Sequence, residues 1–273
     1  MLLLGIDLEI GNPFNEEDGS NRKDENTWLT EVGAVLYDTE MDNTPVKIYS
    51  EIVNEGKGVS QEAQDYTGIT PEIVEAYGSD PKSVAVDMRR LLSKADFVVA
   101  HNGERADKPW LKHFLLRHLP KEAWEGFTPP HWIDTMTDIE YPSTCVQRSL
   151  GYLNSYHLIL NSFPHRAATD VMSMMSILFK YDLDRVIKVS TSPKVLLKAI
   201  APVDSASNKK PYFTAGTPEY KEMEIWKGRV RKKGFRWDGD GSETGSKCWY
   251  KSSRELFINE GVVDEYDFEV TTI

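Results

Sequence analysis

The sequence predicts an α/β protein in which a mixed five-stranded sheet with flanking helices is followed by a small α+β module. Three observations lead to this fold class. Strand and helix patterns follow one another in the order βββ-α-α-β-α-β-α-α up to residue 182. Hydrophobic residues make up 40% of the 273 residues and aromatic residues 11%, which is enough for a core and too many for a disordered chain. Beyond residue 190 the composition becomes rich in Ser, Pro and Lys, and a compact aromatic segment follows.

Three predicted strands open the chain and form an antiparallel meander. Residues 2–10 (LLLGIDLEI) are an apolar run with two acids near its end, which is typical of a buried strand. Residues 27–38 and 45–53 also have strand character, and the stretch TEMDN between them has the length of a hairpin connection. Residues 11–27 contain five acids and two bases, so we expect a long loop there.

Helix and strand patterns alternate over the next 130 residues or so. The first helix has clear end signals, because Thr70 stands at the N-cap position, Pro71 follows it and Gly78 ends the pattern. We expect helices over residues 70–78, 80–95, 108–119, 149–158 and 167–182, and the fourth and fifth strands over residues 96–102 and 131–136.

The change in composition also predicts the domain boundaries. Residues 1–190 are assigned to the first domain, 191–211 to a linker and 212–273 to a small accessory module. The linker contains VLLKAI, for which a strand remains an alternative. Within the module we expect a helix over 219–233, two short strands within 235–251, a helix over 253–259, a closing strand over 267–273, and Trp237 and Trp249 in the core.

Composition and charge narrow the possible classes of protein. The chain has 32 Lys and Arg against 43 Asp and Glu, and this net charge of −11 argues weakly against a nucleic-acid binder. The charge is unevenly distributed, with +6 over residues 205–236 and −6 over 237–273. No apolar run approaches about 18 residues, so no membrane association is expected. The two cysteines are far apart, and MLLLGID lacks the features of a signal peptide, so we expect a cytoplasmic protein.

Two acids on the first strand are the first candidates for chemistry. Asp7 and Glu9 are two residues apart, so their side chains leave the strand on the same face. Carboxylates on an apolar strand are costly to desolvate unless a cation neutralises them, and Mg²⁺ or Mn²⁺ would do so. The alternative is a strand edge whose acids face water.

Two later segments contain further candidates. Asp107 stands where a strand and loop run into a helix, a position that also suits a capping acid. His165 follows Pro164, and Asp170 comes five residues later within the next helix, so the two could face one site from different backbone elements. A solvent-facing His and a first-turn Asp favoured by the helix dipole are the alternatives.

Together, and in this order, these residues resemble the three motifs of the DEDDh (DnaQ-like) 3′–5′ exonucleases. This family includes the proofreading subunit of bacterial DNA polymerase III and ribonuclease T. Asp7-Leu8-Glu9 is similar to the first motif, Asp107 in DKPWL to the second, and His165-Arg-Ala-Ala-Thr-Asp170 to the third. TEVGAV at 30–35 and TGIT at 67–70 support the resemblance, which covers residues 3 to about 182.

The resemblance implies a ribonuclease-H-like fold and metal-dependent hydrolysis at the 3′ end of DNA that releases 5′-nucleotides. Two divalent ions, Mg²⁺ or Mn²⁺, would act there. By this resemblance Asp7 bridges both ions, Glu9 and Asp170 hold the ion that carries the nucleophilic water, and Asp107 helps place the second. His165 would be the general base, since the ordinary pKa of about 6.5 suits that role. Asp134, which also matches a recurrent position of the family, is expected to be structural.

The chain departs from the family pattern in two places. Ile10 stands where the first motif usually continues with Thr, and this position and Asn102 are assigned to nucleic-acid contact. Four residues separate Asn102 from Asp107, where three are common, so Glu104 is a minor rival for the role of Asp107.

The basic stretch KGRVRKKGFR at 227–236 suggests a second nucleic-acid contact. Bases next to aromatic residues suit a surface that follows the phosphate backbone and stacks on bases. The candidate residues are Lys227, Arg229, Arg231, Lys232, Lys233 and Arg236. A solvated helix end above a small aromatic core is the alternative. The pattern GFRWDGD…KCWYK is similar to a short module found after some bacterial and phage DnaQ-like exonucleases.

The expected partner is DNA, with single-stranded or frayed 3′ ends as the first choice. An RNA exonuclease of the same family is an alternative, because the metal site would be shared. A catalytically inactive nuclease fold used for binding is another, although all five motif residues are present. The C-terminal module could also bind a polymerase or replisome partner.

Overall fold

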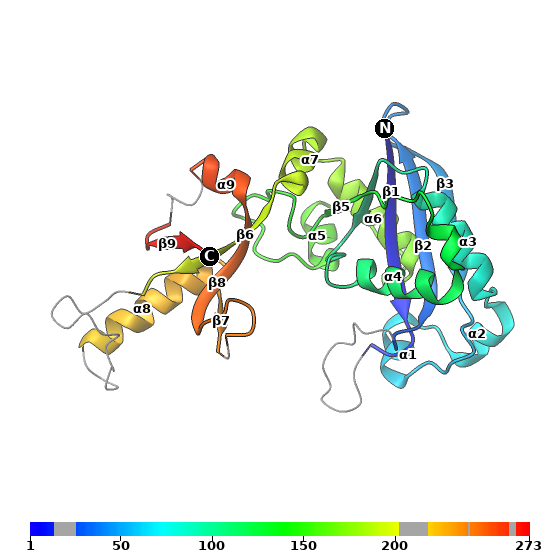
Figure 1. Ribbon diagram of the computed structural model, residues 1–273, viewed down its shortest axis with the longest axis horizontal. Coiled ribbons are helices and arrows are strands. Elements are labelled where there is room, and N and C mark those ends of the chain that lie inside the picture. Colours follow the sequence, from blue (N-terminus) through cyan, green and yellow to red (C-terminus); the bar gives the residue numbers. More distant parts are fainter. Residues whose placement is uncertain (14–25, 202–217, 240, 262–265) are drawn as a thin grey trace. The chain divides into compact units, whose positions relative to one another are not determined.

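The computed structural model describes residues 1–13, 26–201, 218–239, 241–261 and 266–273, and it divides the chain into two compact units (Figure 1). The first unit is Met1–Ser190 and the second is Thr191–Ile273. None of the helices in the described ranges combines the length and the apolar composition that a bilayer crossing requires.

A mixed five-stranded sheet is the centre of the first unit. Its strands are β1 (Leu2–Ile10), β2 (Leu29–Asp38), β3 (Thr44–Ile52), β4 (Phe97–Ala100) and β5 (His131–Asp134), in the spatial order β3-β2-β1-β4-β5. The strands β1, β2 and β3 pair antiparallel, as the short connection between the second and third predicts. The strand β4 runs parallel to both β1 and β5. The predicted sheet and its ribonuclease-H-like fold are confirmed.

Helices cover both faces of this sheet, and each face has its own core. The helices of the unit are α1 (Gln61–Thr67), α2 (Pro71–Tyr77), α3 (Pro81–Leu92), α4 (Asp107–His118), α5 (Leu150–Tyr156), α6 (Ala167–Leu178) and α7 (Leu183–Thr191), with a 3-10 helix η1 at Lys121–Trp124. One core joins β1 and β2 to apolar residues of α3 and α4. The other joins the opposite face of the sheet to α5 and α6.

The strand β1 shows how its sequence divides between these two cores. Leu4, Ile6, Leu8 and Ile10 are buried in the core on the α3 and α4 side. The residues between them face the α6 side, because successive side chains of a strand alternate. The Ile10 side chain, for which the sequence predicts contact with nucleic acid, is 7% exposed and packs in the core on the α3 and α4 side.

Three short helices, α1, α7 and η1, were not predicted. The helix α1 buries only Ala63 and Thr67, so it has no apolar stripe that periodicity could detect. Its end signals are nevertheless present in the sequence. The Ser60 side chain accepts a hydrogen bond from the Ala63 N–H, and Gly68 ends the helix in the left-handed conformation with φ 70°.

The second unit is built on a four-stranded antiparallel sheet in the order β7-β8-β6-β9. Its elements are β6 (Lys194–Ala199), α8 (Pro218–Lys232), β7 (Arg236–Asp238), β8 (Cys248–Arg254), α9 (Glu255–Asn259) and β9 (Val270–Thr272). Trp226, Val230 and Phe235 form its core with Leu197 and Ala199 of β6.

Two predictions for this unit need correction. Residues 194–199 of the predicted linker form β6, which pairs with both β8 and β9 and therefore lies inside the sheet. Residues 202–211 of that linker lie outside the described residues. Trp249 is partly buried against the core, as expected, but Trp237 on the edge strand β7 is 53% exposed.

Candidate active site

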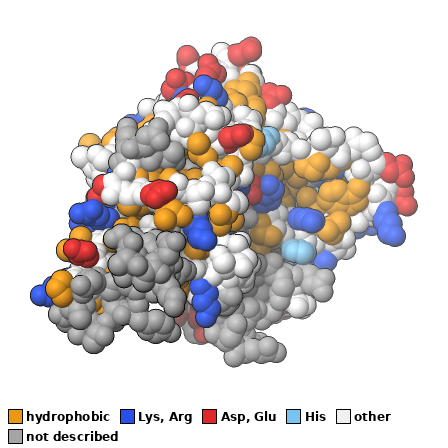
Figure 2. All heavy atoms as spheres, turned by 60° about the vertical axis from the view of Figure 1, so that its left-hand side comes forward, with side chains coloured by type: hydrophobic (Ala, Val, Ile, Leu, Met, Phe, Trp, Pro, Cys, Tyr) orange, Lys and Arg blue, Asp and Glu red, His pale blue; other side chains and the backbone are white. Residues whose placement is uncertain are grey.

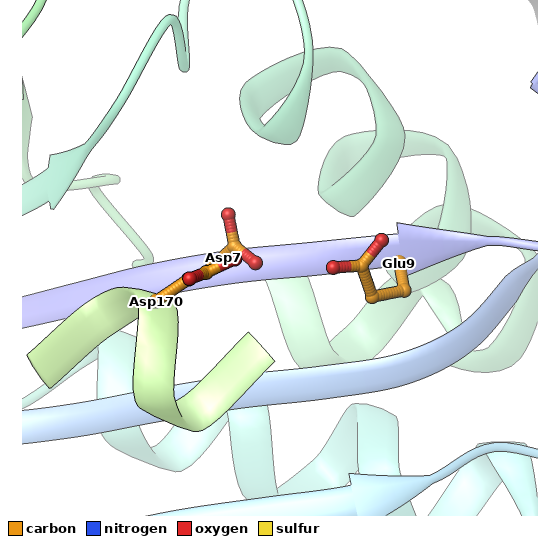
Figure 3. Close-up of side chains that lie close together, drawn as sticks. All are labelled: Asp7, Glu9 and Asp170. Carbon is orange, nitrogen blue, oxygen red and sulfur yellow. The ribbon is translucent and has the colours of Figure 1, made fainter. Parts of the chain in front are cut away.

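Three carboxylates from two elements meet on the α6 side of the sheet. Asp7 and Glu9 extend from β1, and Asp170 extends from the first turn of α6 (Figure 3). One carboxylate oxygen of each residue lies within 4.8 Å of those of the other two. Three negative groups this close to one another form a donor set that suits a hard divalent cation.

Two glycines allow α6 to approach the sheet so closely. Gly33 of β2 pairs with Asp7 of β1, and a Cβ atom at Gly33 would lie 2.3 Å from the backbone carbon of Ala167. A Cβ atom at Gly5 would lie 2.6 Å from Cγ1 of Val171. The first turn of α6, with Asp170, therefore rests directly on the backbone of β2.

We expect Gly33→Ala to push α6 away from β2 and to weaken the binding of a divalent ion by the three carboxylates. The contact is with backbone atoms that cannot rotate away, so overpacking should cost roughly 1–3 kcal/mol of unfolding free energy. Chemical denaturation and the thermal shift on adding Mn²⁺ measure the two effects. Gly58→Ala is the matched control, because a Cβ atom there would meet nothing within 4 Å. Equal effects of the two variants would contradict this account of Gly33.

Glu31 fixes the start of α6. Its side chain is 2% exposed and forms an ion pair with Arg166, at 2.9 Å between Oε1 and Nη2. Its other oxygen, Oε2, accepts a hydrogen bond of 3.0 Å from the backbone N–H of Ala167. The sequence marked Glu31 only as part of TEVGAV. Its role in anchoring α6 depends on a contact with a segment 135 residues later, which no local pattern reveals.

His165 lies beside Asp170 and against an aromatic ring. The backbone N–H of His165 donates a 2.9 Å hydrogen bond to Oδ2 of Asp170, and the Asn161 side chain donates to Oδ1. His165 adopts the left-handed conformation with φ 61°. Its ring centroid is 4.2 Å from that of Tyr66 of α1, a residue that the sequence did not mark.

Asp107, the first residue of α4, lies next to β1. Its Oδ1 atom accepts a 3.0 Å hydrogen bond from the backbone N–H of Leu8, and the residue is 3% exposed. It is not one of the three clustered carboxylates. Its rival Glu104 forms an ion pair of 2.8 Å with Lys108. The structure thus places Asp107, and not Glu104, beside the Asp7–Glu9 segment.

Asp134 organises the loop that leads to Asp107. Its carboxylate accepts hydrogen bonds from the backbone N–H groups of Asn102 at 2.8 Å, Met136 at 3.0 Å and Glu104 at 3.4 Å. These bonds occupy both of its oxygens and hold Asn102 in the left-handed conformation with φ 61°. The geometry is that of a structural acid, as the sequence predicts.

The comparisons with known proteins fit this geometry. The RNase_T family model, described as Exonuclease, matches residues 5–178. The chain belongs to the exonuclease family. The predicted resemblance to DEDDh exonucleases is thereby confirmed for the first unit, and the matched range contains all five motif residues. A search of curated proteins found no match.

Solved structures similar to this exonuclease include several of exonuclease I. The complex of E. coli exonuclease I with a dT13 oligonucleotide has a TM-score of 0.53 and 16% identity, and the match covers 73% of this chain and 48% of that one. The zinc-bound complex of the E. coli protein with single-stranded DNA has a TM-score of 0.56 and 15% identity, covering 72% and 48%. This chain thus spans about half the length of those chains, and identity at this level shows the fold alone.

Burial and mutual repulsion set the ionisation of the clustered acids in this exonuclease domain. Burial raises the pKa of Asp7 well above its usual range, and the negative charges of Asp107, Glu9 and Asp170 raise it further. Burial likewise raises the pKa of Glu9, with Glu31 the largest neighbouring charge. Burial raises the pKa of Asp107 to about 7. A bound cation would reverse this preference for the protonated forms.

These pKa shifts predict that a rise in pH lowers the stability of the metal-free protein and increases the stabilisation by a bound metal ion. Acids whose pKa is raised by folding add stability below their ordinary pKa and lose that contribution as pH rises through the folded value. In EDTA, the free energy of unfolding should therefore fall as pH rises from about 4 to about 7, the ordinary and folded values for Asp107, and stabilisation by Mn²⁺ should grow over that range. Thermal unfolding at several pH values measures both. The decline in EDTA should be shallower in Asp107→Asn, and an identical decline would contradict the assignment.

Proposed function

We propose that this chain is a metal-dependent 3′–5′ exonuclease that hydrolyses phosphodiester bonds at the 3′ end of DNA and releases 5′-nucleotides. The observation that supports it best is the meeting of Asp7, Glu9 and Asp170 within 4.8 Å, with the backbone of His165 hydrogen-bonded to Asp170. These are the residues that the exonuclease motifs predict. Their raised pKa values indicate a site in which a bound cation would stabilise the ionised carboxylates.

Asp7, Glu9 and Asp170 would hold the divalent ions, with Asp107 contributing from the start of α4. Two such ions, Mg²⁺ or Mn²⁺, supply Lewis-acid stabilisation of the attacking and leaving oxygens of an in-line displacement. Glu31 would not be a ligand in this proposal, because both of its oxygens already accept hydrogen bonds from Arg166 and Ala167. Its part is to hold α6, and with it Asp170, against the sheet.

His165 would take the proton from the attacking water. Histidine is the side chain that most often serves as a general base near neutral pH. The backbone of His165 is tied to Asp170, so the imidazole remains next to the carboxylate group while the ring rests against Tyr66. In this arrangement Tyr66 acts on the chemistry only through the position of the imidazole.

We expect Tyr66→Ala to lower kcat by up to about 10²-fold, because a displaced general base loses the orientation that its proton transfer needs. Tyr66→Phe should retain most of the activity, since the ring contact remains. Steady-state kinetics on a labelled oligonucleotide separate an effect on kcat from one on KM. Tyr77→Ala is the matched control, because Tyr77 is 75% exposed on α2. An equal loss in the Phe variant would contradict a positioning role.

A substrate panel tests the proposed function as a whole. Matched 3′-labelled oligonucleotides of single-stranded DNA, duplex DNA, mismatched primer ends and RNA should be compared with Mg²⁺, Mn²⁺ and EDTA. The proposal expects stepwise loss of 5′-nucleotides from single-stranded or frayed DNA ends, only with a divalent ion. Cleavage in EDTA would contradict the proposal. Cleavage of RNA that is faster than cleavage of DNA would show that RNA, and not DNA, is the preferred substrate.

A further inference from the structure

The second unit has cations and aromatic rings on and beside its edge strand β7, here called the tryptophan edge: Arg231, Lys233, Arg236, Trp237 and Trp249. Arg236 and Trp237 are successive residues of β7, so their side chains leave the strand on opposite faces. β7 is the outermost strand of the four-stranded sheet. Trp237 of β7 stands opposite Trp249 of β8, and their ring centroids are 5.8 Å apart. The indole of Trp237 is 53% exposed, although it was expected in the core. A ring this exposed on an edge strand is accessible to a stacking partner.

The structure separates the bases of the 227–236 stretch into two groups. Lys227 forms an ion pair with Glu224 at 2.7 Å, and Arg229 pairs with Asp267 at 3.4 Å. These two charges are already partly neutralised.

Three of the other four bases lie over aromatic rings. The Arg231 guanidinium is 5.1 Å from the centre of the Trp249 ring, and the Arg236 guanidinium is 5.5 Å from that of Tyr250. The Lys233 ammonium is 5.6 Å from the centre of the Tyr266 ring. Within the described part of the chain, these three cations form no ion pair. Rings therefore hold their side chains in place while their charges stay available for an anion.

We propose that the tryptophan edge binds single-stranded nucleic acid, with Trp237 stacking on a base and Arg231, Lys233 and Arg236 contacting phosphates. Aromatic side chains next to unpaired cations are the combination that such surfaces use. Lys and Arg side chains lie directly beside hydrophobic ones on the molecular surface (Figure 2). The exonuclease domain in the same chain favours nucleic acid over an acidic protein segment as the occupant. This surface belongs to the second unit and the carboxylate group to the first, and binding to it does not depend on cleavage.

The phosphate contacts can be tested by the salt dependence of binding. Binding of the full-length chain to a fluorescein-labelled oligo-dT is measured by anisotropy over a range of NaCl concentrations, in EDTA so that no metal-dependent cleavage occurs. The triple variant Arg231→Gln, Lys233→Gln, Arg236→Gln should lower the slope of log affinity against log salt by about 2, from about 0.7 for each phosphate contact on a single strand. The control Lys82→Gln, Lys94→Gln, Lys121→Gln removes three exposed charges of the first unit.

The stacking contact can be tested at Trp237 itself. Trp237→Ala should weaken binding roughly 5- to 100-fold, the range for loss of one stacked base, while Trp237→Phe should retain most of the affinity. Tyr77→Ala removes an aromatic ring of the first unit with similar exposure and serves as control. Thermal unfolding checks that the variants remain folded. If Trp237→Ala does not fold, the binding of Trp237→Phe still tests the proposal.

The possible outcomes decide the proposal. The proposal is supported if the slope of log affinity against log salt falls in the triple variant of the tryptophan edge but not in the lysine control, and if Trp237→Ala weakens binding. If the slope of log affinity against log salt is unchanged, or falls equally in both triple variants, the proposal is overturned. A protein partner would then be the better candidate for the tryptophan edge. A chain that binds through this edge but cleaves nothing would contradict the proposed function alone. A chain that cleaves DNA with an unchanged slope would contradict this inference alone.

Discussion

Asp7→Asn is expected to abolish metal-dependent cleavage and, at the same time, to stabilise the protein in EDTA. In the carboxylate group, burial raises the pKa of Asp7, and the charges of Asp107, Glu9 and Asp170 raise it further. Replacing its carboxylate by a neutral amide of nearly equal size removes repulsion from the metal-free site and removes a ligand from the loaded one. A merely structural acid would not produce these two opposite effects.

Release of label from 3′-labelled single-stranded DNA measures the first effect, and thermal unfolding in EDTA measures the second. Asp42→Asn is a suitable control, because Asp42 is exposed and its φ of 51° is one that asparagine also adopts. Wild-type cleavage by Asp7→Asn would show that the metal-site assignment is wrong. Lost activity without higher stability in EDTA would instead contradict the electrostatic account of the site.

The parts of the fold that could be predicted from the sequence are those encoded by local periodicity. In β1, large apolar side chains alternate with Gly5, Asp7 and Glu9, so one short stretch defines both a core face and a face with two acids. The segment from His165 to Asp170 is similarly local, because a loop residue and a first-turn acid lie within six positions. These stretches also carry the family motifs, which is why fold and site were recognised together.

The missing parts depend on contacts between distant segments. Gly33 matters because Ala167 packs on it, and Glu31 because it anchors α6. The strand β6 was assigned to a linker, with a strand left as the alternative, because its partners β8 and β9 begin only at Cys248 and Val270. Trp237 was expected in the core from its residue type, but it lies on an edge strand whose exposure depends on the strand order. In each case the role of the residue depends on a tertiary contact with a segment that is distant in the sequence.

Replacement of His165 should lower turnover by roughly 10²- to 10⁴-fold, the usual contribution of a general base. The choice of substituent matters here, because the His165 backbone has φ 61° and its N–H donates to Asp170. Alanine disfavours that conformation, so His165→Ala would disturb the position of Asp170 as well as remove the imidazole. Asparagine adopts it more readily. His165→Asn therefore tests the imidazole with less change to the carboxylate group.

Single-turnover cleavage and the thermal shift on adding Mn²⁺ should be measured for both variants. If the imidazole takes the proton, His165→Asn loses turnover as His165→Ala does, but it keeps a thermal shift close to that of the wild type. A smaller shift in the Ala variant alone would measure what the left-handed backbone contributes to holding Asp170. If His165→Asn cleaves at the wild-type rate, another group must take the proton, and the backbone N–H of His165 would be its contribution to the site.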